Sequence, residues 1–184
     1  MNKKRILVLS GFILIAALSR VFPHPYNFAP MGAMAIFGAA YFTNRKLAFV
    51  LPLLAFFVSD LLVNNILYSS FYGGFTLFTP GFYWMYGSMA LIVLAGIFIL
   101  NKVNMKTIIG GSLAASIIFF VVTNFGAWLG NPMYPQTIEG LLMSYTAGIP
   151  FFHYTVAGDL VYAGVMFGAF EYAKFKVPAL QRAN

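Results

Sequence analysis

Long apolar stretches alternate in this chain with short segments that carry nearly all of its basic residues. Ten of the eleven Lys and Arg residues fall in four such segments: Lys3, Lys4 and Arg5; Arg45 and Lys46; Lys102 and Lys106; and Lys174, Lys176 and Arg182. If each apolar stretch crosses a membrane once, all four segments lie on the same side. The positive-inside rule makes that side the cytoplasm.

Composition indicates the same class of protein. Hydrophobic residues make up 61% and charged residues 8% of the 184 residues, and the mean hydropathy is +0.83. These values describe an integral membrane protein and not a soluble domain. The net charge of +7 is explained by anchored helix ends, so nucleic acid is not a predicted partner. Without cysteine, disulfides and thiolate metal sites are excluded, and no cofactor or metal is predicted.

We predict one all-α transmembrane domain over residues 1–184. Its six helices are expected at about 5–22, 29–43, 46–64, 83–101, 106–129 and 148–172, with both termini cytoplasmic. The second segment is short for a span of roughly 20 residues, and its glycines and alanines predict burial among the other helices. The first segment also fits a cleavable signal peptide, and cleavage would leave the orientation of the other five unchanged.

Pairs of small residues at a spacing of four predict close helix packing inside this domain. The pairs are Ala35 and Ala39, Gly110 and Ala114, Gly111 and Ala115, and Gly164 and Gly168.

Three ionisable residues are expected at the outer membrane depth. Asp60 lies near the outer end of the third segment, Asp159 in the outer half of the sixth, and Arg20 at the outer end of the first. An unpaired carboxylate in hydrocarbon costs several kcal/mol. We therefore predict that Arg20 forms an ion pair with Asp60 or Asp159. That pair either locks helices together or forms the polar floor of a ligand pocket.

Further polar side chains are expected at the same depth. Asn27 follows the first segment, Asn124 and Trp128 lie four residues apart on one helical face, and His153 begins the last segment. An amide beside a large aromatic ring suits a planar heterocycle. The alternative is that Asn124 bonds between helices while Trp128 anchors the membrane interface. The predicted ligand-binding set is Arg20, Asn27, Asp60, Asn124, Trp128, His153 and Asp159, with no catalytic residue.

Several stretches resemble a known group of proteins. They are SRVFPHPYNFAPMGAMAIFGAA, LLAFFVSDLLV, TNFGAW and IPFFHYTVAGDLVYAGVMFGAFE. They resemble a family of small uncharacterised bacterial membrane proteins, which is in turn similar to the S components of energy-coupling-factor (ECF) vitamin transporters. The resemblance covers nearly the whole chain. It implies a six-helix S-component fold in the bacterial inner (cytoplasmic) membrane, with a vitamin-like molecule captured from outside.

In ECF transporters a transmembrane coupling subunit and two ATPases supply the energy. S components typically present an alanine pair at spacing four in the first helix, whereas Ala17 here stands four residues from Ile13 and from Val21. The expected function is therefore a substrate-binding subunit or a solitary transporter. The alternatives are an accessory or structural membrane protein without a ligand, and an intramembrane enzyme that uses Asp60 and Asp159 as a carboxylate pair.

Overall fold

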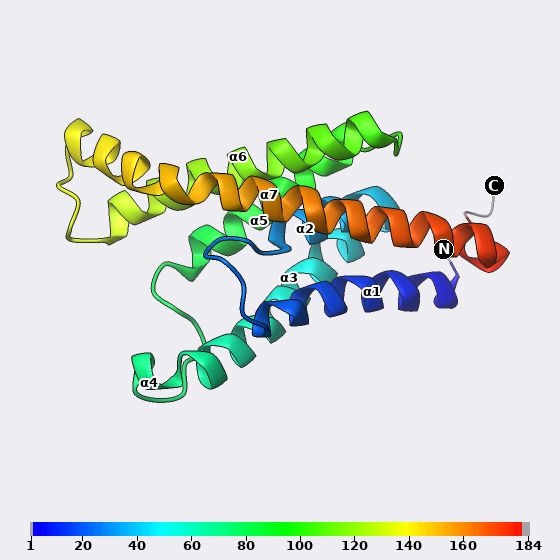
Figure 1. Cartoon of the computed structure of the whole chain (residues 1–184), viewed down its shortest axis with the longest axis horizontal. Coiled ribbons are helices and arrows are strands. Elements are labelled where there is room, and N and C mark those ends of the chain that lie inside the picture. The colour runs from blue at the N-terminus through cyan, green and yellow to red at the C-terminus, as the bar shows by residue number, and fades with distance from the viewer. Residues whose placement is uncertain (1, 182–184) are drawn as a thin grey trace.

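The computed structural model describes residues 2–181, and within that range the chain is entirely helical (Figure 1). The α-helices are α1 Lys3–Leu18, α2 Met31–Tyr41, α3 Arg45–Leu62, α4 Ser69–Tyr72, α5 Phe82–Ile99, α6 Met105–Gly130 and α7 Ile138–Lys176. Three short segments extend or connect them: η1 Ser19–Val21, the π-helical η2 Val63–Leu67 and η3 Pro178–Leu180. The all-α prediction is confirmed. Arg182 lies outside the described residues.

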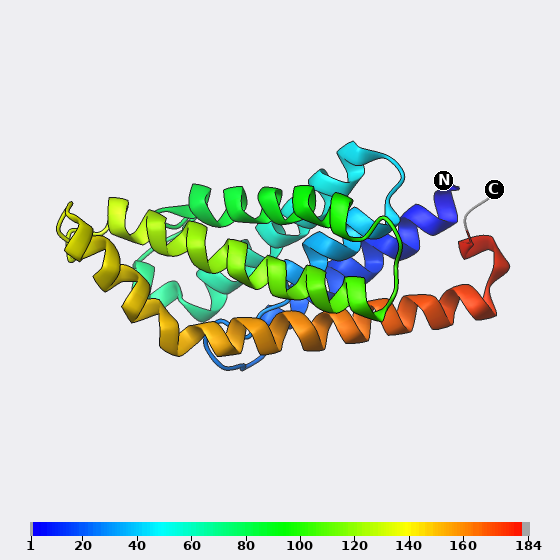
Figure 2. The same cartoon turned by 90° about the horizontal axis from the view of Figure 1, so that it is seen from above.

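The helices form an elongated bundle in which α7 runs along the whole length (Figures 1 and 2). The N- and C-terminal ends of the described chain lie at one end of the bundle, together with the α2–α3 and α5–α6 connections. The basic segments flank these connections and termini. The basic residues of the described chain therefore gather at one end, apart from Arg20, as the charge pattern predicts.

Within residues 2–181, three helices are long and apolar enough to cross a membrane by themselves. They are Arg45–Leu67, which joins α3 to η2, and the helices α5 and α6. The predicted segments at 5–22 and 29–43 form helices of only 16 and 11 residues. The segment at 148–172 belongs to α7, which has 39 residues. The helix is continuous, but its apolar run is interrupted by Asp159, Glu171 and other polar side chains.

The connection between the fifth and sixth predicted segments, which end at about 129 and begin at about 148, is shorter than predicted. Helix α7 begins at Ile138, where the Thr137 side chain accepts a hydrogen bond from the Gly140 amide. This N-cap starts the helix ten residues before the predicted segment. Pro150 lies inside α7, and the first third of α7 bends relative to the rest (Figure 2). A proline there removes one backbone hydrogen bond and bends the helix without ending it.

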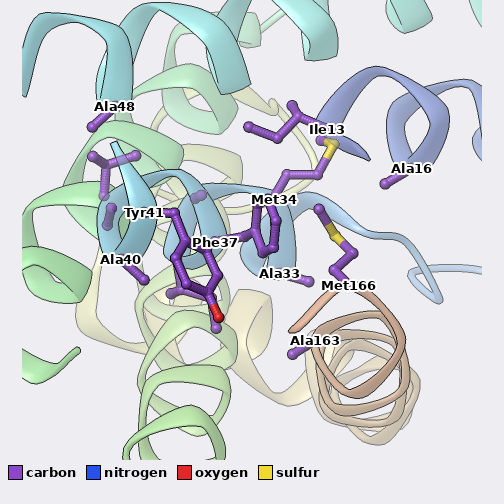
Figure 3. Close-up of a cluster of buried hydrophobic side chains, with 14 of the residues drawn as sticks. Ile13, Ala16, Ala33, Met34, Phe37, Ala40, Tyr41, Ala48, Ala163 and Met166 are labelled. Atoms are coloured by element: carbon purple, nitrogen blue, oxygen red, sulfur yellow. The ribbon is translucent and has the colours of Figure 1, made fainter. Parts of the chain in front are cut away.

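Helix α2 occupies the centre of the bundle. Every residue from Gly32 to Tyr41 is buried, and the helix packs against α1, α3, α5, α6 and α7. The cluster around it includes Met34 and Phe37 of α2, Ile13 of α1 and Met166 of α7 (Figure 3). The prediction that this Gly- and Ala-rich segment is buried among its neighbours is confirmed. Small side chains allow five helices to approach one short helix closely.

The small-residue pairs divide into two groups. Ala35 and Ala39 are buried in α2, and the pair 111 and 115 is buried in α6. In contrast, a Cβ added at Gly110, Gly164 or Gly168 would meet no atom within 4 Å. The packing prediction is therefore wrong for the pair 110 and 114 and for the pair 164 and 168, because these faces of α6 and α7 point away from the other helices.

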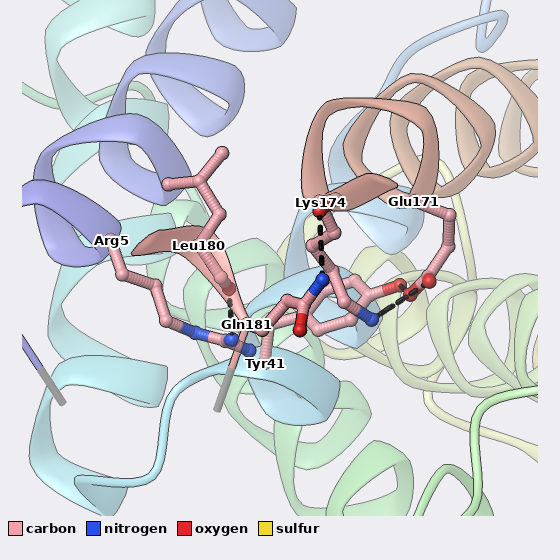
Figure 4. A network of polar contacts seen from close by, with 6 residues as sticks. All are labelled: Arg5, Tyr41, Glu171, Lys174, Leu180 and Gln181. Atoms are coloured by element: carbon pink, nitrogen blue, oxygen red, sulfur yellow. Dashed lines mark hydrogen bonds and ion pairs between the residues drawn. The ribbon is translucent and has the colours of Figure 1, made fainter. Parts of the chain in front are cut away.

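A polar network closes the basic end of the bundle (Figure 4). The Tyr41 hydroxyl donates to Glu171 Oε1 at 2.5 Å, and Lys174 forms an ion pair with Glu171 at 2.7 Å. Arg5 Nη1 donates to the Leu180 carbonyl. These bonds join the end of α2 to α7 and the start of α1 to the segment that follows α7.

We expect Gly38→Ala to destabilise the bundle, because the new Cβ would lie 2.8 Å from Pro52 Cγ and 3.2 Å from the Ala48 carbonyl oxygen. Overpacking of this kind costs about 1–3 kcal/mol. Gly168→Ala is the matched control, since it meets nothing and gains up to about 1 kcal/mol of helix propensity. Thermal unfolding in detergent measures both variants. Equal melting temperatures would contradict the close α2–α3 packing.

Candidate functional site

Arg20 forms an ion pair with Asp60 just beyond the end of α1 and near the end of α3, away from the basic segments. Its Nη1 lies 2.7 Å from Asp60 Oδ1 and donates to Ser59 Oγ at 2.6 Å. Arg20 belongs to the short turn η1 that follows α1, and Ser59 and Asp60 lie near the end of α3. The predicted pairing of Arg20 with one of the two acids is confirmed, and the partner is Asp60.

Aromatic side chains hold this ion pair in place. The Arg20 guanidinium carbon lies 4.5 Å from the centre of the Phe56 ring, and the Tyr86 hydroxyl donates to Asp60 Oδ2 at 3.3 Å. Both bonds from Arg20 use Nη1, so Nε and Nη2 have no hydrogen-bond partner among residues 2–181. The guanidinium therefore retains donors that are available to a ligand.

Asp159 of α7 closes the N-terminus of the central helix α2. Its Oδ1 accepts from the Ala33 amide at 3.2 Å and its Oδ2 from the Ser116 hydroxyl at 2.7 Å. Pro30, the residue before α2, offers no side-chain cap. The carboxylate thus supplies from another helix the acceptor that the buried first-turn amides require, and the helix dipole favours its negative charge.

Two glycines permit this close approach. A Cβ at Gly32 would lie 2.4 Å from Asp159 Oδ1, and a Cβ at Gly158 would lie 2.9 Å from the Ala29 amide nitrogen. The loop before α2 therefore lies directly on α7. Asn27 in this loop has a φ of 63°, a left-handed conformation that asparagine tolerates better than most residues.

A cavity of about 460 Å³ lies beneath this loop. Its wall is mainly apolar and aromatic, with Arg20 and Asp159 as its charged members. The lining residues are Arg20, Phe22, Pro23, His24, Tyr26, Asn27, Ala29, Met31, Gly32, Val63, Leu67, Tyr68, Met85, Phe119, Thr155 and Asp159. We call this hollow the outer cavity.

A second cavity of about 400 Å³ adjoins the outer cavity between α6 and α7. Four residues line both: Asn27, Met85, Phe119 and Thr155. Asn124 lies in the wall of the second cavity and donates through Nδ2 to the Phe120 carbonyl at 2.8 Å. Its Oδ1 accepts no hydrogen bond from residues 2–181. The two cavities are therefore neighbours that share part of their walls.

The structure brings together only part of the predicted ligand-binding set. Arg20, Asn27 and Asp159 line the outer cavity, while Asn27 and Asn124 line the second cavity. Asp60 lies outside both linings and acts on the outer cavity through Arg20.

Trp128 and His153 line neither cavity. The Trp128 indole donates to the Pro135 carbonyl at 2.9 Å and so holds the turn between α6 and α7. His153 is exposed, and the centre of its ring lies 4.0 Å from the centre of the Tyr154 ring.

Several residues of the site carry no recognisable signal in the sequence. Ser116 bonds Asp159, Tyr86 bonds Asp60, and Thr155 lies between the two cavities. A single hydroxyl within an apolar helix predicts little, because it bonds its own backbone equally well. Within the described chain, no group of three His, Asp or Glu side chains is placed to hold a metal ion.

The comparisons with known proteins give one match. A family model described as "Family of unknown function (DUF6580)" matches residues 1–180. No curated protein and no solved structure matches the chain.

We expect Arg20→Gln to destabilise the protein by about 3–5 kcal/mol, because the buried Asp60 carboxylate loses its counter-ion. The double variant Arg20→Gln/Asp60→Asn removes both charges and is expected to recover about half of that loss or more. Thermal unfolding of the two single variants and the double variant gives the coupling free energy. Additive effects of the single substitutions would contradict a direct interaction.

Proposed function

We propose that this chain, which belongs to the DUF6580 family of unknown function, is a membrane protein. It captures a vitamin-like small molecule from the extracytoplasmic side. The observation that carries the proposal is the outer cavity beneath the loop before α2, with Arg20 and Asp159 in its wall. The second cavity lies beside it and shares four of its lining residues.

The size and lining of the outer cavity support ligand capture. Small-molecule sites typically have volumes of about 300–1,000 Å³, apolar and aromatic walls, and few polar groups that fix orientation. The outer cavity has about 460 Å³. Phe22, Tyr26, Tyr68 and Phe119 supply aromatic surface, and the unpaired nitrogens of Arg20 supply hydrogen-bond donors. A planar ring with polar substituents fits such a wall.

The position of the cavity supports capture from outside. The basic residues of the described chain, Arg20 excepted, gather at the opposite end of the bundle. If that end faces the cytoplasm, the outer cavity opens on the extracytoplasmic side. We place the protein in a bacterial inner membrane, with all six predicted segments embedded in the bilayer and both termini cytoplasmic.

The S-component resemblance leaves two modes of action, and the surface of α1 favours one of them. Ile13 and Ala17 face inward and are 1% and 0% exposed, whereas Leu7 and Ile15 are 75% and 72% exposed. The outer surface of α1 therefore presents large side chains instead of an alanine pair. This favours a solitary transporter over one that docks on an ECF-type coupling subunit with its ATPases.

A structural or accessory role is the second candidate, because the buried polar residues do bond one another. Arg20 pairs with Asp60, and Asp159 with Ser116 and α2. Those bonds join η1 to α3, and α7 to α2 and α6, without a ligand. The enzyme alternative has less support, since the two carboxylates have separate partners and are not a mutually bonded pair.

Native mass spectrometry of the protein purified from its own membrane in mild detergent tests the proposal. We expect a retained molecule of vitamin size, or one acquired from a vitamin panel. Thr155→Phe is expected to abolish that adduct, because Thr155 is 9% exposed and lines both cavities.

Thr146→Phe is the matched control. Thr146 lies on the same helix, bonds the carbonyl four residues earlier as Thr155 does, and lines neither cavity. The Thr146→Phe variant should retain the same adduct as the unsubstituted protein. An adduct that survives Thr155→Phe, or a clean apo mass with every compound of the panel, would favour the structural role.

A further inference from the structure

The two charged groups in the wall of the outer cavity differ in how they are compensated. The charge of Arg20 is neutralised by Asp60, whose carboxylate lies 2.7 Å away. The ion pairs among residues 2–181 are Arg20 with Asp60 and Lys174 with Glu171. No basic side chain of the described chain therefore forms an ion pair with Asp159.

The partners of Asp159 are dipoles and not ions. It accepts hydrogen bonds from the amides of Ala33 and Gly32 and from the Ser116 hydroxyl. A carboxylate offers about four acceptor positions, so one position is left for a ligand. Asp159 is 2% exposed, and it lines the outer cavity. An incompletely compensated acid at membrane depth typically marks the path of a substrate or an ion.

The remaining wall favours the same ligand chemistry. Phe22, Tyr26, Tyr68 and Phe119 are the aromatic residues of its lining. The negative faces of such rings attract cations and the positive edges of N–H groups. Arg20, the basic residue of this lining, is already paired with Asp60, so an anion gains little from it.

We propose that the outer cavity selects substrates that present a hydrogen-bond donor, neutral or cationic, to Asp159, and that it discriminates against the carboxylate form of the same ring. This inference rests on the proposed function and names its substrate class. Arg20 then binds an acceptor on the substrate through Nε or Nη2. A ring amide offers both a donor and an acceptor, and an amine offers the donor while a ring oxygen or nitrogen offers the acceptor, whereas a ring carboxylate satisfies only Arg20 and is repelled by Asp159.

Matched compounds test this selection in purified protein. The probes are nicotinamide with nicotinate and pyridoxamine with 4-pyridoxate, titrated with native mass spectrometry as the readout. For each pair that binds, we expect the amide or amine to bind roughly tenfold or more tightly than the acid. An acid that binds equally or more tightly overturns the inference while leaving the proposed function standing. Absence of binding by every probe counts against both.

Three variants assign the selection to its charges. Asp159→Asn keeps a side-chain oxygen for α2 but loses the charge. The preference for the amide or amine over the matching acid should therefore fall below about threefold. Asp60→Asn lies outside the cavity lining and leaves Arg20 positive without its counter-ion, so it should raise affinity for the acids about tenfold. Glu139→Gln removes an equal charge from an exposed position on α7 and should change nothing. An unaltered preference in both Asp159→Asn and Asp60→Asn overturns the inference.

Discussion

The carboxylate of Asp159 at the N-terminus of α2 is the interaction on which the rest of the architecture depends. Helix α2 has 11 residues and is buried nearly throughout, so its first amides cannot reach water. Asp159 supplies the missing acceptor from α7 and is itself bonded by Ser116 of α6. One side chain thus fixes the depth of α2 relative to the two longest helices. Without it, the central helix would leave unpaired amides in an apolar interior.

The same contact creates the space that we interpret as a binding site. Because α7 approaches the chain closely at Gly158 and Asp159, the loop before α2 is held over the outer ends of the helices. The Arg20–Asp60 pair fixes the other side of that loop on α3. The outer cavity lies between these two anchors, and Arg20 and Asp159 both line it. The groups that anchor this loop are thus among those that we propose to act on a ligand, and each carboxylate has a structural role even with no ligand bound.

The sequence predicts the class of fold because hydropathy and charge act over whole segments. The six predicted segments coincide with α1, α2, α3 with η2, α5, α6 and part of α7, and Arg20 was the one base at a depth that Asp60 can reach. The cap on α2 could not be predicted, since Asp159 and Ala33 are 126 residues apart. Trp128 and His153 have residue types that suit ligands, but their helix positions turn them toward the α6–α7 turn and the surface.

The side of the membrane on which the outer cavity opens is the central claim, and site-specific labelling measures it most directly. The chain has no cysteine, so each introduced thiol is unique. Tyr26→Cys places a thiol in the cavity loop at a position that is 75% exposed, and Asn101→Cys places one in the exposed connection between α5 and α6. In intact cells, a membrane-impermeant maleimide should modify the first variant and reach the second only after permeabilisation. The reverse pattern would contradict capture from outside.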